Sequence, residues 1–170
     1  MTSRDQHRSA VYAAETTLGR MLDNCAESGN PMVTIDAIPL TLPPEARFAT
    51  AEDVQRYIDR LMDWEPIQAA FGDIKLVHVR IRRSAKAKAH YDPDTAVIAI
   101  PETGPGRTML REHVVLHELA HHLDTSAGPA HGPAFLDIYL TLLERVMAPE
   151  AALALRILIS HNGVTTTTTP

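Results

Sequence analysis

Apolar residues recur at helical spacing in five segments of the chain. Residues three and four apart share one face of an α-helix, so this repeat predicts helices that each bury one face. Gly29-Asn30-Pro31 follows the first segment, and Pro133 and Pro149 stand where a proline can open a helix. The predicted helices cover residues 9–26, 51–62, about 108–124, 133 to about 146, and 149 to about 158.

Between these segments the pattern changes to that of β-strands. Two short β-prone runs, 32–35 and 38–42, flank Asp36-Ala37 and predict a hairpin or a bent strand. Residues 74–82 alternate between two faces, which is typical of a strand with one buried face. Residues 87–91 and 96–100 flank Asp92-Pro93-Asp94-Thr95, and turn residues at this point predict a second hairpin.

The order of these elements indicates the fold class. Helices and strands follow one another without a β-α-β alternation, which predicts an α+β domain with a small, mostly antiparallel sheet and C-terminal helices. The length of 170 residues fits one domain, which we place at residues 1–164. Residues 165–170, a run of threonines ending in Pro170, offer nothing apolar to bury and are predicted to be a disordered tail.

The composition of the chain indicates which partners and which cellular compartment to expect. The formal net charge of −5 argues against a surface built for nucleic acid, which requires an excess of Lys and Arg. Cys25 is the only cysteine, so the chain has no internal disulfide, and a reducing compartment is expected. No stretch approaches the ~20 apolar residues of a membrane span. We therefore expect a cytoplasmic protein without a membrane partner.

The segment His117-Glu118-Leu119-Ala120-His121 carries the chemistry. His117 and His121 are four residues apart on a predicted helix, so both imidazoles leave one face and can share a metal ion. Zinc suits such nitrogen ligands and lowers the pKa of a bound water to about 7. Glu118 can flank the metal and accept a proton from that water. The apolar side chains before and between the histidines predict that the rest of the helix is buried.

A catalytic zinc site of this kind needs a third protein ligand. His131 is the first candidate, because it follows a Gly128-Pro129 turn and precedes Gly132, which permits a close approach of the backbone. Glu144 is an alternative carboxylate ligand, although an exposed pair with Arg145 explains it more simply. Asp124, one turn beyond His121, could instead orient a ligand imidazole.

These residues resemble a known family. The segments 115–123 and 131–135, together with the hairpin 89–101 before them, are similar to the SprT-like and WLM group of zinc metallopeptidases, and more closely to a family of small stand-alone metallohydrolases within it. The resemblance extends over most of residues 5–160. It implies a zincin-like domain in which three histidines hold Zn²⁺ and Glu118 is the general base. It also implies that a peptide or protein substrate lies extended along the hairpin at 87–101.

Three further residues are candidates for the cleft. His90 and Tyr91 occupy opposite faces of a strand, so at most one of them can face the site. Tyr91 or Tyr139 could stabilise the oxyanion of a tetrahedral intermediate. His122 points away from His121 and is expected at the surface or near the ligands rather than on the metal.

Three functions are compatible with these patterns. The leading one is a zinc-dependent hydrolase, a metallopeptidase that cleaves amide bonds with Glu118 as general base. A non-catalytic, zinc-stabilised binding module would close the fourth zinc position with another side chain and would not need Glu118. A metallohydrolase of small amides or esters would use the same residues on a smaller substrate.

Overall fold

The computed structural model describes residues 5–72, 74–84 and 88–166. Contacts divide the chain into two units, and each has secondary structure of both kinds. Unit 1 comprises the chain up to Glu45 and from Ser126 onward, and unit 2 comprises Ala46–Thr125. The predicted α+β class is confirmed, with two small sheets. Most of the predicted tail, residues 167–170, lies outside the described residues.

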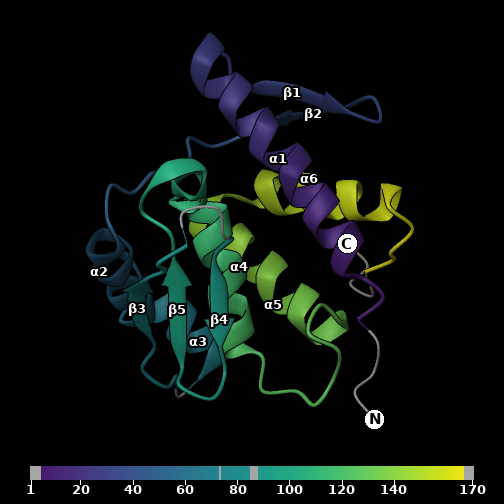
Figure 1. The fold of residues 1–170 in the computed structure, drawn as a ribbon. Helices are drawn as coiled ribbons and strands as arrows, with labels where there is room; N and C mark the ends of the chain where they lie inside the picture. The colour runs from purple at the N-terminus through teal and green to yellow at the C-terminus, as the bar shows by residue number, and fades with distance from the viewer. Residues whose placement is uncertain (1–4, 73, 85–87, 167–170) are drawn as a thin grey trace. The chain divides into compact units, whose positions relative to one another are not determined.

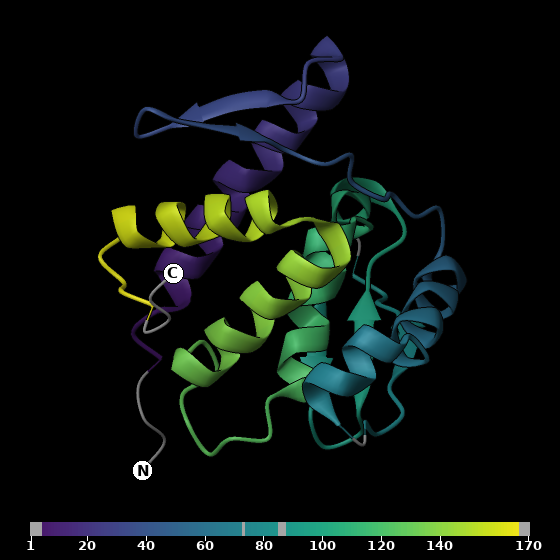
Figure 2. The same ribbon diagram turned by 180° about the vertical axis from the view of Figure 1, so that it is seen from behind.

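Unit 1 is built from long helices and one hairpin. Helix α1 contacts α6, and the hairpin strand β1 contacts α1 while β2 contacts α6 (Figures 1 and 2). Fully buried apolar side chains such as Val11, Leu18 and Leu155 line these helices. The elements are α1 (Arg8–Ser28), β1 (Met32–Ile35), β2 (Ile38–Thr41), α5 (Pro133–Leu142), the π-helical segment η2 (Leu143–Met147) and α6 (Pro149–His161).

Helix α1 and strand β1 end at the turn residues that the sequence indicates. Gly29 closes α1 with a left-handed φ of 69°, which glycine adopts at low cost. Asp36 and Ala37 join β1 to β2 with positive φ values of 51° and 63°. Two such residues make the turn whose twist matches that of antiparallel strands, and Ile35 pairs with Ile38 across it. The hairpin prediction is confirmed.

Unit 2 contains a three-stranded sheet. Its strands are β3 (His78–Ile81), β4 (His90–Asp92) and β5 (Val97–Ile100), in the order β3-β5-β4 (Figure 1). The β4–β5 pair is antiparallel, as the hairpin prediction requires. The β3–β5 pair is parallel, so this sheet is mixed and the prediction of mostly antiparallel strands is only partly right. Strand β5 takes the centre because its Ile98, Ala99 and Ile100 are the buried ones.

Strand β3 is shorter than its alternating pattern predicts. Only four of the residues from 74 to 82 form a strand, and Leu76 and Ile81 are 80% and 51% exposed. In the second hairpin, Asp92 accepts hydrogen bonds from the Thr95 hydroxyl at 2.8 Å and the Asp94 N–H at 3.1 Å. The Thr95 bond is the largest of the effects that hold the pKa of Asp92 below its ordinary value of 3.8.

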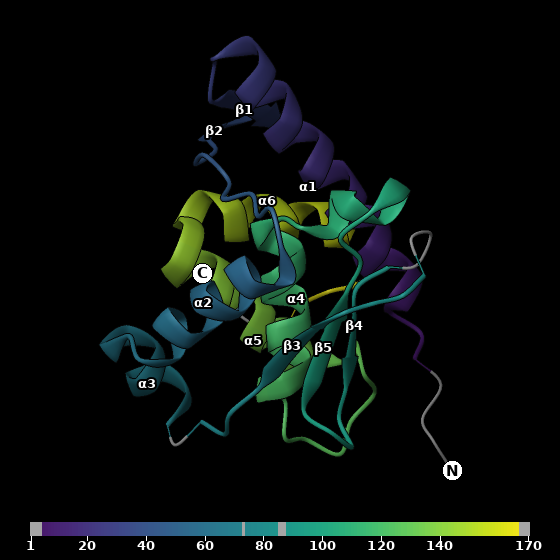
Figure 3. The same ribbon diagram turned by 60° about the vertical axis from the view of Figure 1, so that its left-hand side comes forward.

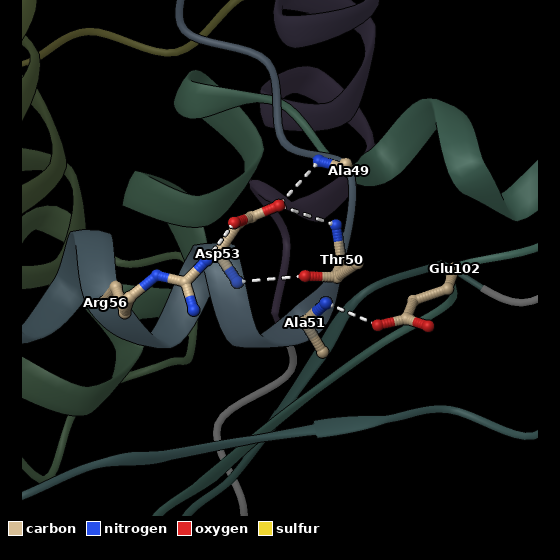
Figure 4. A network of polar contacts seen from close by, with 6 residues as sticks. All are labelled: Ala49, Thr50, Ala51, Asp53, Arg56 and Glu102. Carbon is tan, nitrogen blue, oxygen red and sulfur yellow. Dashed lines mark hydrogen bonds and ion pairs between the residues drawn. The ribbon is translucent and has the colours of Figure 1, made fainter.

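Two helices of unit 2 pack against this sheet. Helix α2 (Ala51–Met62) contacts β3 and the short helix α3 (Glu65–Phe71), and α4 (Glu112–Leu123) contacts β4 (Figure 3). Thr50 caps α2: its hydroxyl accepts the Asp53 N–H at 3.1 Å, and the Asp53 carboxylate accepts the Thr50 N–H at 3.1 Å (Figure 4). Glu102, just after β5, accepts the Ala51 N–H and ties the start of α2 to the sheet.

Helix α4 begins later than predicted and is anchored at its first residue. A 3₁₀-helix, η1 (Gly104–Met109), replaces the expected first turn. The Glu112 carboxylate accepts the Ala46 N–H at 3.0 Å and the Tyr57 hydroxyl at 2.6 Å, while its own N–H donates to the Ala46 carbonyl at 3.0 Å. These bonds fix the end of the helix that carries the histidines.

Candidate metal centre

Helix α4 brings His117 and His121 together on one face. Their Nε2 atoms are 3.1 Å apart, and the rings meet edge to face with centroids 4.8 Å apart. His117 is only 2% exposed, and His121 is half-buried. The i, i+4 spacing therefore places both imidazoles on one face of the helix, as predicted, with one nitrogen of each ring close to the other.

The 3.1 Å separation fits either of two arrangements. One is a hydrogen bond, in which one neutral ring donates and the other accepts. The other is a shared metal ion, because two nitrogens bound to one tetrahedral zinc at 2.0–2.1 Å stand about 3.3 Å apart. The separation of the two nitrogens is thus close to the one that a shared zinc ion requires.

His131 belongs to unit 1, where it lies two residues before the start of α5. Its Nδ1 lies 2.5 Å from Oδ2 of Asp5, and its carbonyl oxygen is 3.2 Å from Nδ1 of His7. The rings of Tyr12 and Phe135 stand 5.4 Å and 5.0 Å from the His131 ring, centroid to centroid. The approach of the chain demands Gly132, because a Cβ there would lie 2.9 Å from the Pro129 carbonyl oxygen.

The three predicted histidine ligands are close to one another. The ligand atoms of His117, His121 and His131 all lie within 4.8 Å of one another. Three imidazole nitrogens at such separations could hold one metal ion, and His117 and His131 are buried. Imidazole is a ligand that zinc, copper, iron and nickel all accept, so the donor set does not by itself choose the metal.

Glu118 follows His117 on α4 and is 5% exposed. One residue rotates the side chain about 100° around a helix, so Glu118 stands beside the His117/His121 face rather than on it. Residues 115–120 are all buried, and these include the apolar side chains of α4 whose burial the sequence predicts.

Tyr91 on β4 makes a specific contact with α4. Its hydroxyl is 3.0 Å from Nδ1 of His122, and His122 Nε2 is 2.8 Å from the Lys75 carbonyl oxygen. A carbonyl only accepts, so His122 Nε2 donates and its Nδ1 accepts the Tyr91 proton. Burial, and then the Asp92 carboxylate, raise the pKa of Tyr91 above its ordinary value of 10.0. Both ring nitrogens of His122 thereby have partners other than a metal, as predicted for this residue.

The other residues predicted to lie in or near the site differ in their exposure. His90, the neighbour of Tyr91 on β4, is exposed. Tyr139 is fully buried on α5, with its ring 5.7 Å from that of Phe135. Asp124 is the residue that ends α4 and is half-buried. Of the proposed peptide platform at 87–101, the structure describes residues 88–101, and residue 87 lies outside the described residues.

Two acidic residues of the site region were missed by sequence reasoning. The Asp5 carboxylate lies on Nδ1 of His131, and Glu112 anchors the start of α4. An acid in the first turn of a helix is a recognisable signal for Glu112, since it suits the positive end of the helix dipole. No local pattern marks Asp5, because its partner lies 126 residues away.

No family model, curated protein or solved structure matches this chain. In the described part of the chain, none of the helices combines the length and apolar composition that crossing a bilayer requires.

Proposed function

We propose that the protein is a zinc-dependent hydrolase of the metallopeptidase class, resembling the SprT-like and WLM enzymes. The observation that carries the proposal is the group of His117, His121 and His131, whose ligand atoms lie within 4.8 Å of one another beside the buried Glu118. Three imidazoles with a carboxylate next to them match the donor set of catalytic zinc sites, which keep a fourth position for water or substrate.

The residues divide the work between them. The three histidines hold the metal, and zinc so bound supplies Lewis acidity that polarises a carbonyl and acidifies water. Glu118, held next to the ligands by α4, accepts the proton of the attacking water and later delivers it to the leaving amine. Burial of Glu118 and His117 excludes competing solvent from this transfer.

The edge strand β4 supports a peptide as the substrate. β4 is one of the two outer strands in the order β3-β5-β4, and it contacts α4, the helix of His117 and Glu118. An extended peptide can add to such an edge through main-chain hydrogen bonds, which hold it without demanding one sequence. A small amide or ester would not use this edge.

The test combines metal content with hydrolysis of an unbiased peptide library. Purified wild type should carry about one zinc per chain, and Glu118→Gln should keep the zinc but lose activity by at least about 10²-fold, the range expected for a general base. His121→Ala should lose the zinc. His122→Gln is the matched control on the same helix and should keep it, because the partners of His122 are Tyr91 and Lys75.

Each outcome decides between the candidate functions. Full activity in Glu118→Gln would refute the assigned mechanism. Zinc in wild type without hydrolysis of any library peptide, with small amides and esters cleaved instead, would favour the small-molecule hydrolase. Zinc without hydrolysis of either kind would favour the non-catalytic binding module, and wild type that takes up no zinc contradicts all three.

A further inference from the structure

We propose that Asp5 is the positioning residue of the metal centre, where its carboxylate fixes the tautomer and orientation of His131. The inference rests on the proposed function, because it takes His131 as a metal ligand. It assigns a role in that site to the segment before α1.

The contact itself determines which nitrogen of His131 is available to a metal. Oδ2 of Asp5 and Nδ1 of His131 are 2.5 Å apart, and the His131 side chain is 5% exposed. An ionised carboxylate can only accept, so Nδ1 carries the proton and donates it. In the neutral imidazole the lone pair is then on Nε2. Asp5 thereby makes Nε2 the ligand atom, the same atom that His117 and His121 direct at each other.

Other groups of unit 1 hold the ring in this orientation. His7 Nδ1 lies 3.2 Å from the His131 carbonyl oxygen, so the segment that carries Asp5 contacts the backbone of His131 as well as its ring. Tyr12 on α1 and Phe135 on α5 flank the ring. An imidazole held from several sides loses little rotational freedom when it binds a metal, which favours high affinity.

The other carboxylate oxygen shows that Asp5 is placed at a cost. Oδ1 of Asp5 is buried and has no hydrogen-bond partner within the described residues. An oxygen that gives up water without gaining a partner destabilises the fold. A residue chosen for stability alone would avoid this cost, whereas a carboxylate that must orient His131 incurs it. The cost of burying the Asp5 carboxylate therefore favours a role for its charge at His131.

Unit 1 supplies a matched control for the test. His161 Nε2 and Asp36 Oδ2 are 2.6 Å apart, which repeats the Asp–His chemistry at a surface position with side chains 44% and 57% exposed. Neither residue is a candidate ligand. Asn is well tolerated at the left-handed φ of Asp36, so Asp36→Asn removes the charge without straining the hairpin turn.

The first measurement is zinc affinity by competition with a chromophoric chelator. Asp5→Ala should bind zinc about 10–100-fold more weakly than wild type, the usual effect of removing a carboxylate behind a ligand histidine. Asp36→Asn should bind like wild type. Asp5→Asn keeps a hydrogen-bond acceptor but loses the charge, so its zinc affinity should lie between those of Asp5→Ala and Asp36→Asn. Its circular dichroism spectrum should be unchanged. Wild-type affinity in both Asp5 variants would overturn the proposal.

The second measurement reads the tautomer of His131 directly, by ¹⁵N NMR of the imidazole in the metal-free protein. Wild type should show the proton on Nδ1, and Asp5→Ala should lose this preference. A proton on Nε2 in wild type would overturn the role of Asp5. This readout needs no metal, so wild type that binds no zinc would refute the proposed function while the tautomer still decides whether Asp5 orients His131.

Discussion

At the scale of single residues, Glu112 shows how a buried acid can hold a functional helix. Its carboxylate accepts from the Tyr57 hydroxyl at 2.6 Å and from the Ala46 N–H at 3.0 Å, and it is only 7% exposed. A buried acceptor that loses a donor keeps the cost of its desolvation. The Tyr57 hydroxyl therefore contributes to the stability of unit 2 and to the position of α4.

We predict that Tyr57→Phe lowers the free energy of unfolding by about 1–3 kcal/mol, because it leaves one oxygen of Glu112 without its hydroxyl donor. Urea denaturation measures the change. The same substitution made in a Glu112→Ala background should cost less, and the difference is the coupling between the two side chains. Equal costs in both backgrounds would mean that the hydrogen bond contributes nothing.

Local spacing predicts only part of the site at this scale. The i, i+4 pair His117 and His121 and the glycine after His131 are visible in the sequence, since short segments of backbone determine them. Asp5 is invisible because its role depends on a contact with a residue that the chain reaches only after folding.

At the scale of secondary-structure elements, the hairpin β1–β2 carries strain that a substitution can relieve. Ala37 has φ 63° at an exposed turn position, and a Cβ in this conformation costs roughly 1–2 kcal/mol. We predict that Ala37→Gly stabilises the protein by about 0.5–1 kcal/mol in thermal or urea unfolding. Ala13→Gly, on the exposed side of α1, is the control and should destabilise by about 1 kcal/mol. A loss of stability in both variants would contradict the prediction.

Elements were predicted well where propensity and turn residues act together. α1, α2, α6 and both hairpins follow from apolar periodicity bounded by Gly, Pro or a capping Thr. The pattern failed for β3, whose alternation extends over twice the length of the strand that forms. Pairing partners decide how much of an alternating run becomes a strand, and the parallel pairing of β3 with β5 is not encoded within either segment.

At the scale of the whole molecule, metal binding should be linked to stability. A ligand that binds only the folded protein stabilises it by about 2.7 kcal/mol when its free concentration is one hundred times Kd. For a chain of this length we predict that this amount of zinc raises Tm by roughly 5–10 °C over the chelator-treated protein. Differential scanning fluorimetry measures the shift. His131→Ala should lose most of it, and a full shift in that variant would remove His131 from the ligand set.

The division of the chain into units has a consequence for its synthesis. Residues 46–125 form one unbroken segment, whereas unit 1 is completed only by chain on either side of it. Helix α1 is synthesised before unit 2, whereas α6, which contacts it, is synthesised after unit 2. The ribosome synthesises the chain from the N-terminal side. Val11, Leu18 and Leu22 of α1 therefore lack their contacts with α6 while unit 2 is being synthesised. Folding of unit 1 therefore has to await the synthesis of the segment that follows unit 2, whereas unit 2 can fold from one continuous segment.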